Sequence, residues 1–121
     1  MLFYFSFFFT NPKSIKLPNS LKVVGEEAFS RCIQLTEITL GTGLETIKPF
    51  AFADNRITGT IHIPATCTSI GEGAFSSTVS TYGQQLQGFT VDVNNPYYST
   101  NGHFLMNKTQ TTIIATANAN Q

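Results

Sequence analysis

The 121-residue sequence predicts a mainly β repeat protein, a solenoid of about three and a half 23-residue turns with a C-terminal β-hairpin. Three observations support this fold class. An Ala-Phe pair starts at Ala28, Ala51 and Ala74, so the interval is 23 residues each time. Apolar residues around the pair return at the same interval, and the segments that carry them alternate apolar and polar residues as strands do. The columns in register are Ile15/Ile38/Ile61, Leu17/Leu40/Ile63, Leu21/Leu44/Cys67 and Val24/Ile47/Ile70.

The first copy sets the pattern for the others. Ser14–Leu17 is expected to be a strand, because two apolar residues flank Lys16, and Pro18 should end it. Gly25, and Gly71 in the third copy, should permit a tight bend. The Ala-Phe pair then closes the turn, with a single helical turn as one option. The phenylalanines of the three pairs should stack as a buried ladder, which consists of Phe29, Phe52 and Phe75.

Three regions are expected along the chain: an apolar N-terminal segment (1–13), the repeats (14–93), and a hairpin with a tail (94–121). The polar stretch Ser76–Gln85 is an insertion that should form an exposed loop before a fourth strand, Phe89–Val93. Two apolar runs, Phe104–Met106 and Thr111–Ala115, flank a polar turn and should form the hairpin. The tail Asn118–Gln121 should fray.

The first ten residues, Met1–Thr10, are rich in phenylalanine but too short to span a bilayer. Three interpretations stay open. The segment could be a strand that covers the first turn, a clipped or degenerate signal peptide, or an artefact of the chosen start site. No Lys or Arg precedes the apolar run, which counts against a complete signal peptide.

The repeat consensus resembles the BspA-like leucine-rich repeats, the surface antigen and adhesin type. The resemblance rests on Ile15–Cys32, Leu35–Phe52 and Ile61–Phe75, and the middle copy departs from it with Gly41 in place of proline. Phe89–Ala115 is similar to the Asn-Pro-x-Tyr hairpin often found between such repeats. The resemblance implies a leucine-rich-repeat solenoid of a cell-surface or secreted protein that binds host matrix proteins or other cells.

Composition limits the classes of function. The net charge is zero and 12% of residues are charged, so the basic stripe of a nucleic-acid-binding protein is missing. Cys32 and Cys67 fall two turns apart, about 10 Å, which is too far for a disulfide. We therefore expect buried thiols, no metal site and no cofactor.

No group of residues predicts catalysis. His62 and His103 fall in different turns and should be surface imidazoles. Glu26, Glu27 and Glu72 sit at bends of the solenoid, whereas paired acid/base carboxylates need a shared cleft. We therefore predict that the protein is not an enzyme.

The outward side of the strands is the candidate binding surface, because solenoids present ligands with stacked strands. Two residues outside it need comment. Asn107 begins an Asn-Lys-Thr glycosylation sequon, a weak signal in a Thr-rich chain. Of Tyr97 and Tyr98, one should anchor the hairpin on the fourth turn while the other faces solvent. The predicted binding residues are Lys16, Glu37, Thr39, Thr60, His62 and Thr90.

The predicted function is a non-enzymatic binding module for cell-surface attachment or protein–protein interaction through this strand face. Its partners would be protein or glycan ligands, extracellular matrix among them, with no nucleic acid and no membrane span in this chain. Two alternatives stay open: a structural spacer or intracellular scaffold repeat, and an accessory domain of an enzyme that lies outside the chain.

Overall fold

The structure is a computed structural model that describes residues 13–32, 34–76 and 86–117. Within these ranges the chain forms ten strands and no helix, as a mainly β repeat protein should. Three predicted segments lie outside them: Met1–Thr10, nearly all of Ser76–Gln85, and Asn118–Gln121. The strands are β1 (Ser14–Lys16), β2 (Val23–Val24), β3 (Glu37–Thr39), β4 (Thr46–Ile47), β5 (Thr60–Ile63), β6 (Ser69–Ile70), β7 (Gly88–Val91), β8 (Tyr98–Thr100), β9 (Phe104–Asn107) and β10 (Ile113–Thr116).

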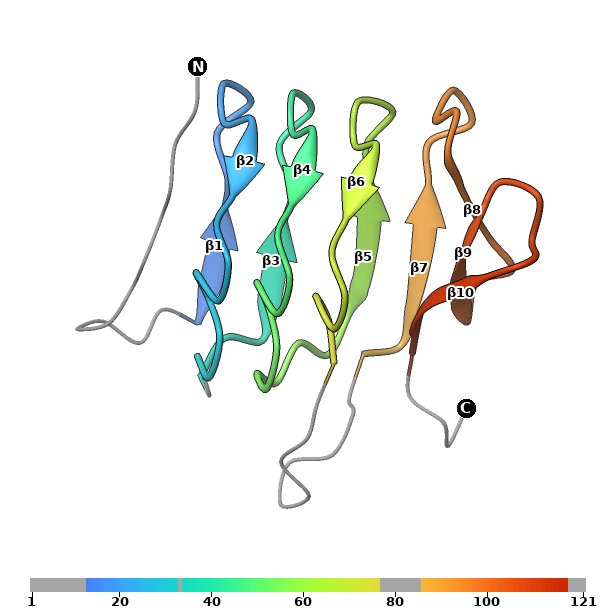
Figure 1. The fold of residues 1–121 in the computed structure, drawn as a ribbon. Helices are drawn as coiled ribbons and strands as arrows, with labels where there is room; N and C mark the ends of the chain where they lie inside the picture. The colour runs from blue at the N-terminus through green and yellow to red at the C-terminus, as the bar shows by residue number, and fades with distance from the viewer. Residues whose placement is uncertain (1–12, 33, 77–85, 118–121) are drawn as a thin grey trace.

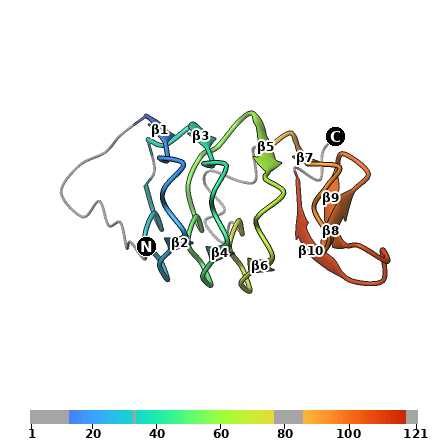
Figure 2. The ribbon, with the colours of Figure 1, turned by 90° about the horizontal axis from the view of Figure 1, so that it is seen from above.

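Successive copies stand side by side, and each contributes one strand to either of two rows (Figure 1). Row one consists of β1, β3, β5 and β7, and row two consists of β2, β4 and β6. Figure 2 shows the rows on opposite sides of the molecule. All strand pairs within the rows are parallel, because each copy returns the chain to the same end before the next strand begins.

The strand register confirms the 23-residue interval of the first three copies. Ile15 is opposite Ile38 in row one, and Val24, Ile47 and Ile70 are opposite one another in row two. Between β5 and β7 the partners are Ile61 and Phe89, which are 28 residues apart. The five additional residues belong to the predicted insertion before the fourth copy.

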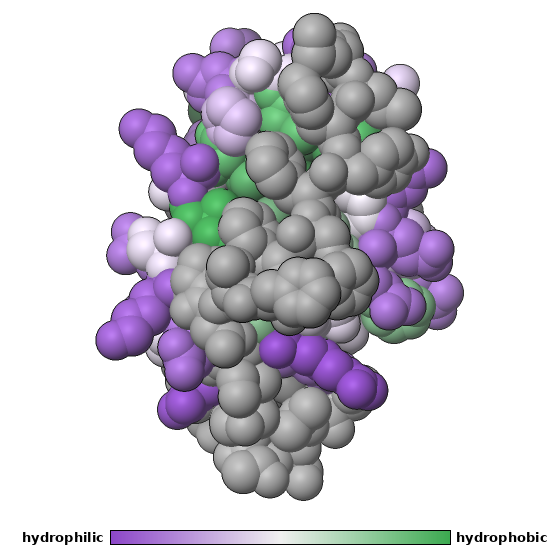
Figure 3. All heavy atoms as spheres, turned by 90° about the vertical axis from the view of Figure 1, so that its left-hand side faces the viewer, coloured by the Kyte–Doolittle hydropathy of each residue, from purple (hydrophilic) through white to green (hydrophobic). Residues whose placement is uncertain are grey.

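The core lies between the two rows and contains the predicted apolar columns. Viewed from the side of the first copy, hydrophilic residues line both flanks of the molecule and hydrophobic residues lie between them (Figure 3). Phe29 and Phe52 stack with ring centroids 5.2 Å apart, and Phe52 and Phe75 follow at 5.6 Å. All three rings are buried, so the predicted phenylalanine ladder is confirmed. Phe89 continues it edge-on, 5.8 Å from Phe75.

The corner that carries the Ala-Phe pair is not a helical turn. Glu27, Phe50 and Gly73, one in each copy, have φ values of 57°, 57° and 65°. A right-handed helix excludes positive φ, so each corner is a sequence of tight turns instead. Backbone hydrogen bonds then join the corners of neighbouring copies, for example Phe29 N–H to Ala51 O at 2.7 Å and Phe52 N–H to Ala74 O at 2.8 Å.

Gly71 has a role other than the expected one. Its φ is not among the positive values, so the bend does not require a glycine there. A Cβ on Gly71 would instead collide with the backbone nitrogen of Pro49 in the preceding copy. The glycine therefore permits the third copy to pack closely on the second.

Row one divides into two sheets, β1–β3 and β5–β7. Up to Thr58 the third copy follows the second at an offset of 22 residues, since Thr58 N–H donates to Thr36 O at 3.0 Å. Gly59 is one additional residue, after which Ile61 occupies the position of Ile38 at an offset of 23. The bulge at Gly59 explains why the ladder is interrupted between β3 and β5.

Beyond the rows, β8, β9 and β10 form an antiparallel sheet in the order β10-β9-β8. This sheet packs at the end of the stack that carries β7 (Figure 1). Cys32 and Cys67 are both buried and free, as predicted. The described residues include no helix that is long and apolar enough to cross a bilayer.

Candidate functional site

All the predicted binding residues project from row one and are exposed to solvent. Their positions follow from strand alternation: Ile15, Ile38 and Ile61 point into the core, so the residues on either side point outward. We call this outward side the strand face. One column of it contains Lys16, Thr39, His62 and Thr90, and the other contains Glu37 and Thr60.

The register places these side chains next to one another. Lys16 is directly opposite Thr39, and His62 is directly opposite Thr90. Neighbouring strands of a sheet are about 4.8 Å apart, so such pairs are in contact distance. The Nδ1 atom of His62 is hydrogen-bonded to Oγ1 of Thr90 at 2.7 Å, which fixes the imidazole against the strand face.

The analysis of the sequence missed two features of the strand face. Ser14 is exposed and opposite Glu37, so it extends the second column by one residue. The alternation about Ile15 would have identified it. Gly88, opposite Thr60, ends that column without a side chain. A Cβ at Gly88 would collide with the carbonyl oxygen of Gly102, so the β8–β9 turn limits the face on this side.

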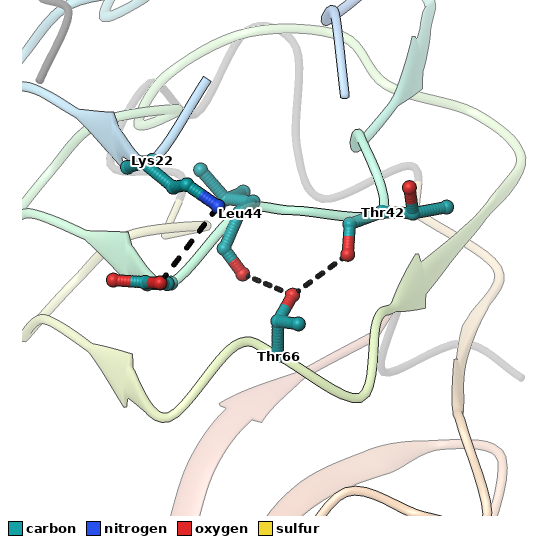
Figure 4. A network of polar contacts seen from close by, with 5 residues as sticks. Lys22, Thr42, Leu44 and Thr66 are labelled. Atoms are coloured by element: carbon teal, nitrogen blue, oxygen red, sulfur yellow. Dashed lines mark hydrogen bonds and ion pairs between the residues drawn. The ribbon is translucent and has the colours of Figure 1, made fainter. Parts of the chain in front are cut away.

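The opposite side of the stack is built differently. In row two the residues follow a polar corner, and Thr66 Oγ1 donates to the carbonyl oxygens of Thr42 and Leu44 at 2.9 and 2.7 Å (Figure 4). Lys22 and Glu45 form an ion pair at 3.9 Å with both side chains more than a third exposed. An exposed pair of this kind stabilises a protein by at most about 1 kcal/mol, so it serves as a neutral reference surface.

The described residues contain no group of three or more His, Cys, Asp or Glu side chains that could hold a metal ion. His62 lies on the strand face, whereas His103 follows the β8–β9 turn and contacts the ring of Phe104 edge-on, with centroids 4.8 Å apart. Burial raises the pKa of the Cys67 thiol to about 11 and raises that of Cys32 as well, so both remain protonated at neutral pH.

The tyrosines divide as predicted. Tyr97 is 58% exposed, whereas Tyr98 is buried. The hydroxyl of Tyr98 accepts a hydrogen bond from Ile70 N–H at 2.8 Å. The anchor therefore reaches the third copy rather than the fourth.

Two asparagines of the C-terminal sheet form turns. The Oδ1 atom of Asn101 accepts hydrogen bonds from the N–H groups of His103 and Phe104 at 3.0 and 2.8 Å. The side chain of Asn107 bonds to Thr111 and Thr112 through three contacts of 2.8, 2.8 and 3.0 Å. Asn107 thus holds the β9–β10 turn, and its glycosylation stays a prediction.

These observations define the class: a protein of stacked β copies with leucine-rich-repeat spacing. The model of the BspA type leucine rich repeat region matches residues 2–115 in six copies, and the chain belongs to this family. A search of curated proteins finds no match.

Among solved structures, the crystal structure of the pneumococcal vaccine antigen PcpA is similar, with a TM-score of 0.75 and 25% sequence identity. The alignment covers 87% of this chain and 25% of that one. This chain therefore spans about a quarter of the length of that antigen.

Proposed function

We propose that this chain is a non-enzymatic binding module of a cell-surface or secreted protein, and that it attaches to protein or glycan ligands of the extracellular matrix through the strand face. The proposal treats the fold as a leucine-rich-repeat solenoid of about three and a half turns that a hairpin ends. One observation carries it: side chains from four parallel strands are exposed on the same side and in register.

The chemistry of the strand face suits many modest contacts. It combines a cation at Lys16, a carboxylate at Glu37 and an imidazole at His62 with the hydroxyls of three threonines. Because the strands are held at both rows and at the corners, the side chains lose little conformational freedom when a ligand binds. Repetition of such copies in a longer protein would increase avidity without any new kind of contact.

The family supports the proposal as well. BspA type repeats match most of the chain, and the similar structure is that of a vaccine antigen. A location outside the cell accords with both. Protease shaving of intact cells tests the location: release of the chain's peptides from unbroken cells is expected, and protection until lysis would favour an intracellular scaffold.

Binding is tested with the triple variant Lys16→Ala/Glu37→Ala/His62→Ala against an array of matrix proteins and glycans. We expect Kd for the captured ligand to rise at least about tenfold, while Tm stays near that of the wild type because all three side chains are exposed. The matched control is Lys22→Ala/Glu45→Ala, which removes two charges from row two. Equal affinity of both variants and the wild type would favour a spacer.

A further inference from the structure

The end of row two at β6 is where another parallel copy would add. In a parallel ladder, successive residues bond alternately to the two neighbouring strands. Gly71 N–H bonds back to Ile47 O in the preceding copy at 2.7 Å. The N–H of Ile70 therefore points forward, toward the position of the next strand.

No backbone carbonyl meets that N–H; the hydroxyl of Tyr98 does, at 2.8 Å. The carbonyl groups of the adjoining corner are satisfied in a similar way. Asn95 Nδ2 donates to Pro64 O at 2.9 Å and to Cys67 O at 2.8 Å. Side chains thus occupy the backbone sites that would continue row two.

Asn95 occupies a position that is apolar in every earlier copy. The turn bond from Asn95 N–H to Asp92 O repeats the one from Cys67 N–H to Pro64 O, which places Asn95 in the column of Leu21, Leu44 and Cys67. Like Cys67, it is fully buried. Its Oδ1 accepts the N–H groups of Tyr97 and Tyr98 at 2.9 Å each, so it turns the chain away from row two and into β8.

Row one is closed by backbone instead. Phe89 N–H of β7 donates to Gly102 O in the β8–β9 turn at 3.0 Å. Gly88 admits this turn because it has no Cβ. Lys108 of the β9–β10 turn donates to Asn95 O at 3.0 Å and ties the far side of the same sheet to the corner.

From these contacts we infer that residues 95–117 are an end cap that closes a latent strand-addition site, and that Tyr98 and Asn95 are its closing residues. The site fits a parallel β-strand whose carbonyl group replaces the hydroxyl of Tyr98. A second copy of this chain has such a strand in β2, which meets β4 in the same register as β4 meets β6. Addition of this kind is head-to-tail, so it leads to open chains rather than closed dimers.

The first test is hydrogen exchange in the full chain with Tyr98→Phe. Loss of the hydroxyl leaves Ile70 N–H without an acceptor, so its exchange should accelerate about tenfold while the amides of β4 keep their rates. Tyr97→Phe is the matched control, because it removes the same group from an exposed neighbour and should leave Ile70 unchanged. Equal exchange of Ile70 in the wild type and Tyr98→Phe would overturn the assignment.

The second test is analytical ultracentrifugation of Asn95→Ala/Tyr98→Phe over a range of concentrations, with circular dichroism to confirm that the variant is folded. We expect the mass of the variant to grow with concentration beyond that of a dimer, while the wild type and Tyr97→Phe stay constant. A folded variant that remains a monomer, or that stops at a dimer, would refute head-to-tail addition. Should the double variant unfold, the exchange experiment on Tyr98→Phe still decides the closing role.

Discussion

Replacement of Phe52 by alanine tests the stacking of the copies most directly. Phe52 is the middle member of the phenylalanine ladder and is 1% exposed. Its ring lies parallel to those of Phe29 and Phe75, with interplanar angles of 1° and 3°. The substitution therefore removes both contacts at once and leaves a cavity between the second copy and each of its neighbours.

The expected cost follows from burial. Removing a buried phenylalanine ring destabilises a protein by about 3–5 kcal/mol, which includes the cavity that remains. The whole domain is expected to have about 5–15 kcal/mol of stability. For a chain of this size each kcal/mol lowers Tm by about 4 °C or more, so Tm should fall by at least about 12 °C.

The assay is thermal and urea unfolding followed by circular dichroism. Phe50→Ala is the matched control, because Phe50 lies two residues away in the same corner and is 40% exposed. We expect the control to lose less than about 1 kcal/mol. A Tm of Phe52→Ala equal to that of the wild type would refute the ladder as a source of stability, and with it the packing of the copies.

Three further predictions concern the corners and the buried polar groups. Glu27→Gly should raise the free energy of unfolding by about 0.5–1 kcal/mol in a urea titration, because glycine adopts a φ of 57° without strain, whereas Gly73→Ala should lower it. Asn95→Ala should lower it by at least about 2 kcal/mol, because four hydrogen bonds of the buried side chain are lost. Burial raises the pKa of Cys67 from 9.0 to about 11, so folding favours the protonated thiol. Stability should therefore be full below pH 9 and fall as pH rises toward 11, with a smaller fall in Cys67→Ala; Tyr98, whose pKa burial also raises, contributes in the same direction.

The repeat register could be predicted because it is written in apolar residues. The core columns, such as Val24, Ile47 and Ile70, recur at a fixed interval, and burial then determines which neighbours face outward. The same alternation identified the strand face, although it passed over Ser14. These features depend on short-range periodicity, which a single sequence contains.

The remaining features depend on contacts between copies. Glu27 in the left-handed region could not be read from residue type, because the hydrogen bonds of the neighbouring corner impose that backbone conformation. Gly59 interrupts row one through a single additional residue, which is indistinguishable from an ordinary polar strand position in the sequence. Asn95 and Tyr98 continue the core columns, but a polar side chain in a core column is recognisable only when its hydrogen-bond partners are known.

The direction of the bonds between copies has a mechanical consequence. In each row the ladder hydrogen bonds run along the axis of the stack, from one copy to the next, and the corner bonds join the same neighbours. A tension applied along this axis would load the few bonds of one interface at a time, as in the opening of a zipper, rather than all strands in shear. The molecule should therefore extend under low force in steps of one copy and recover by restacking, and so absorb a pull without breaking at once.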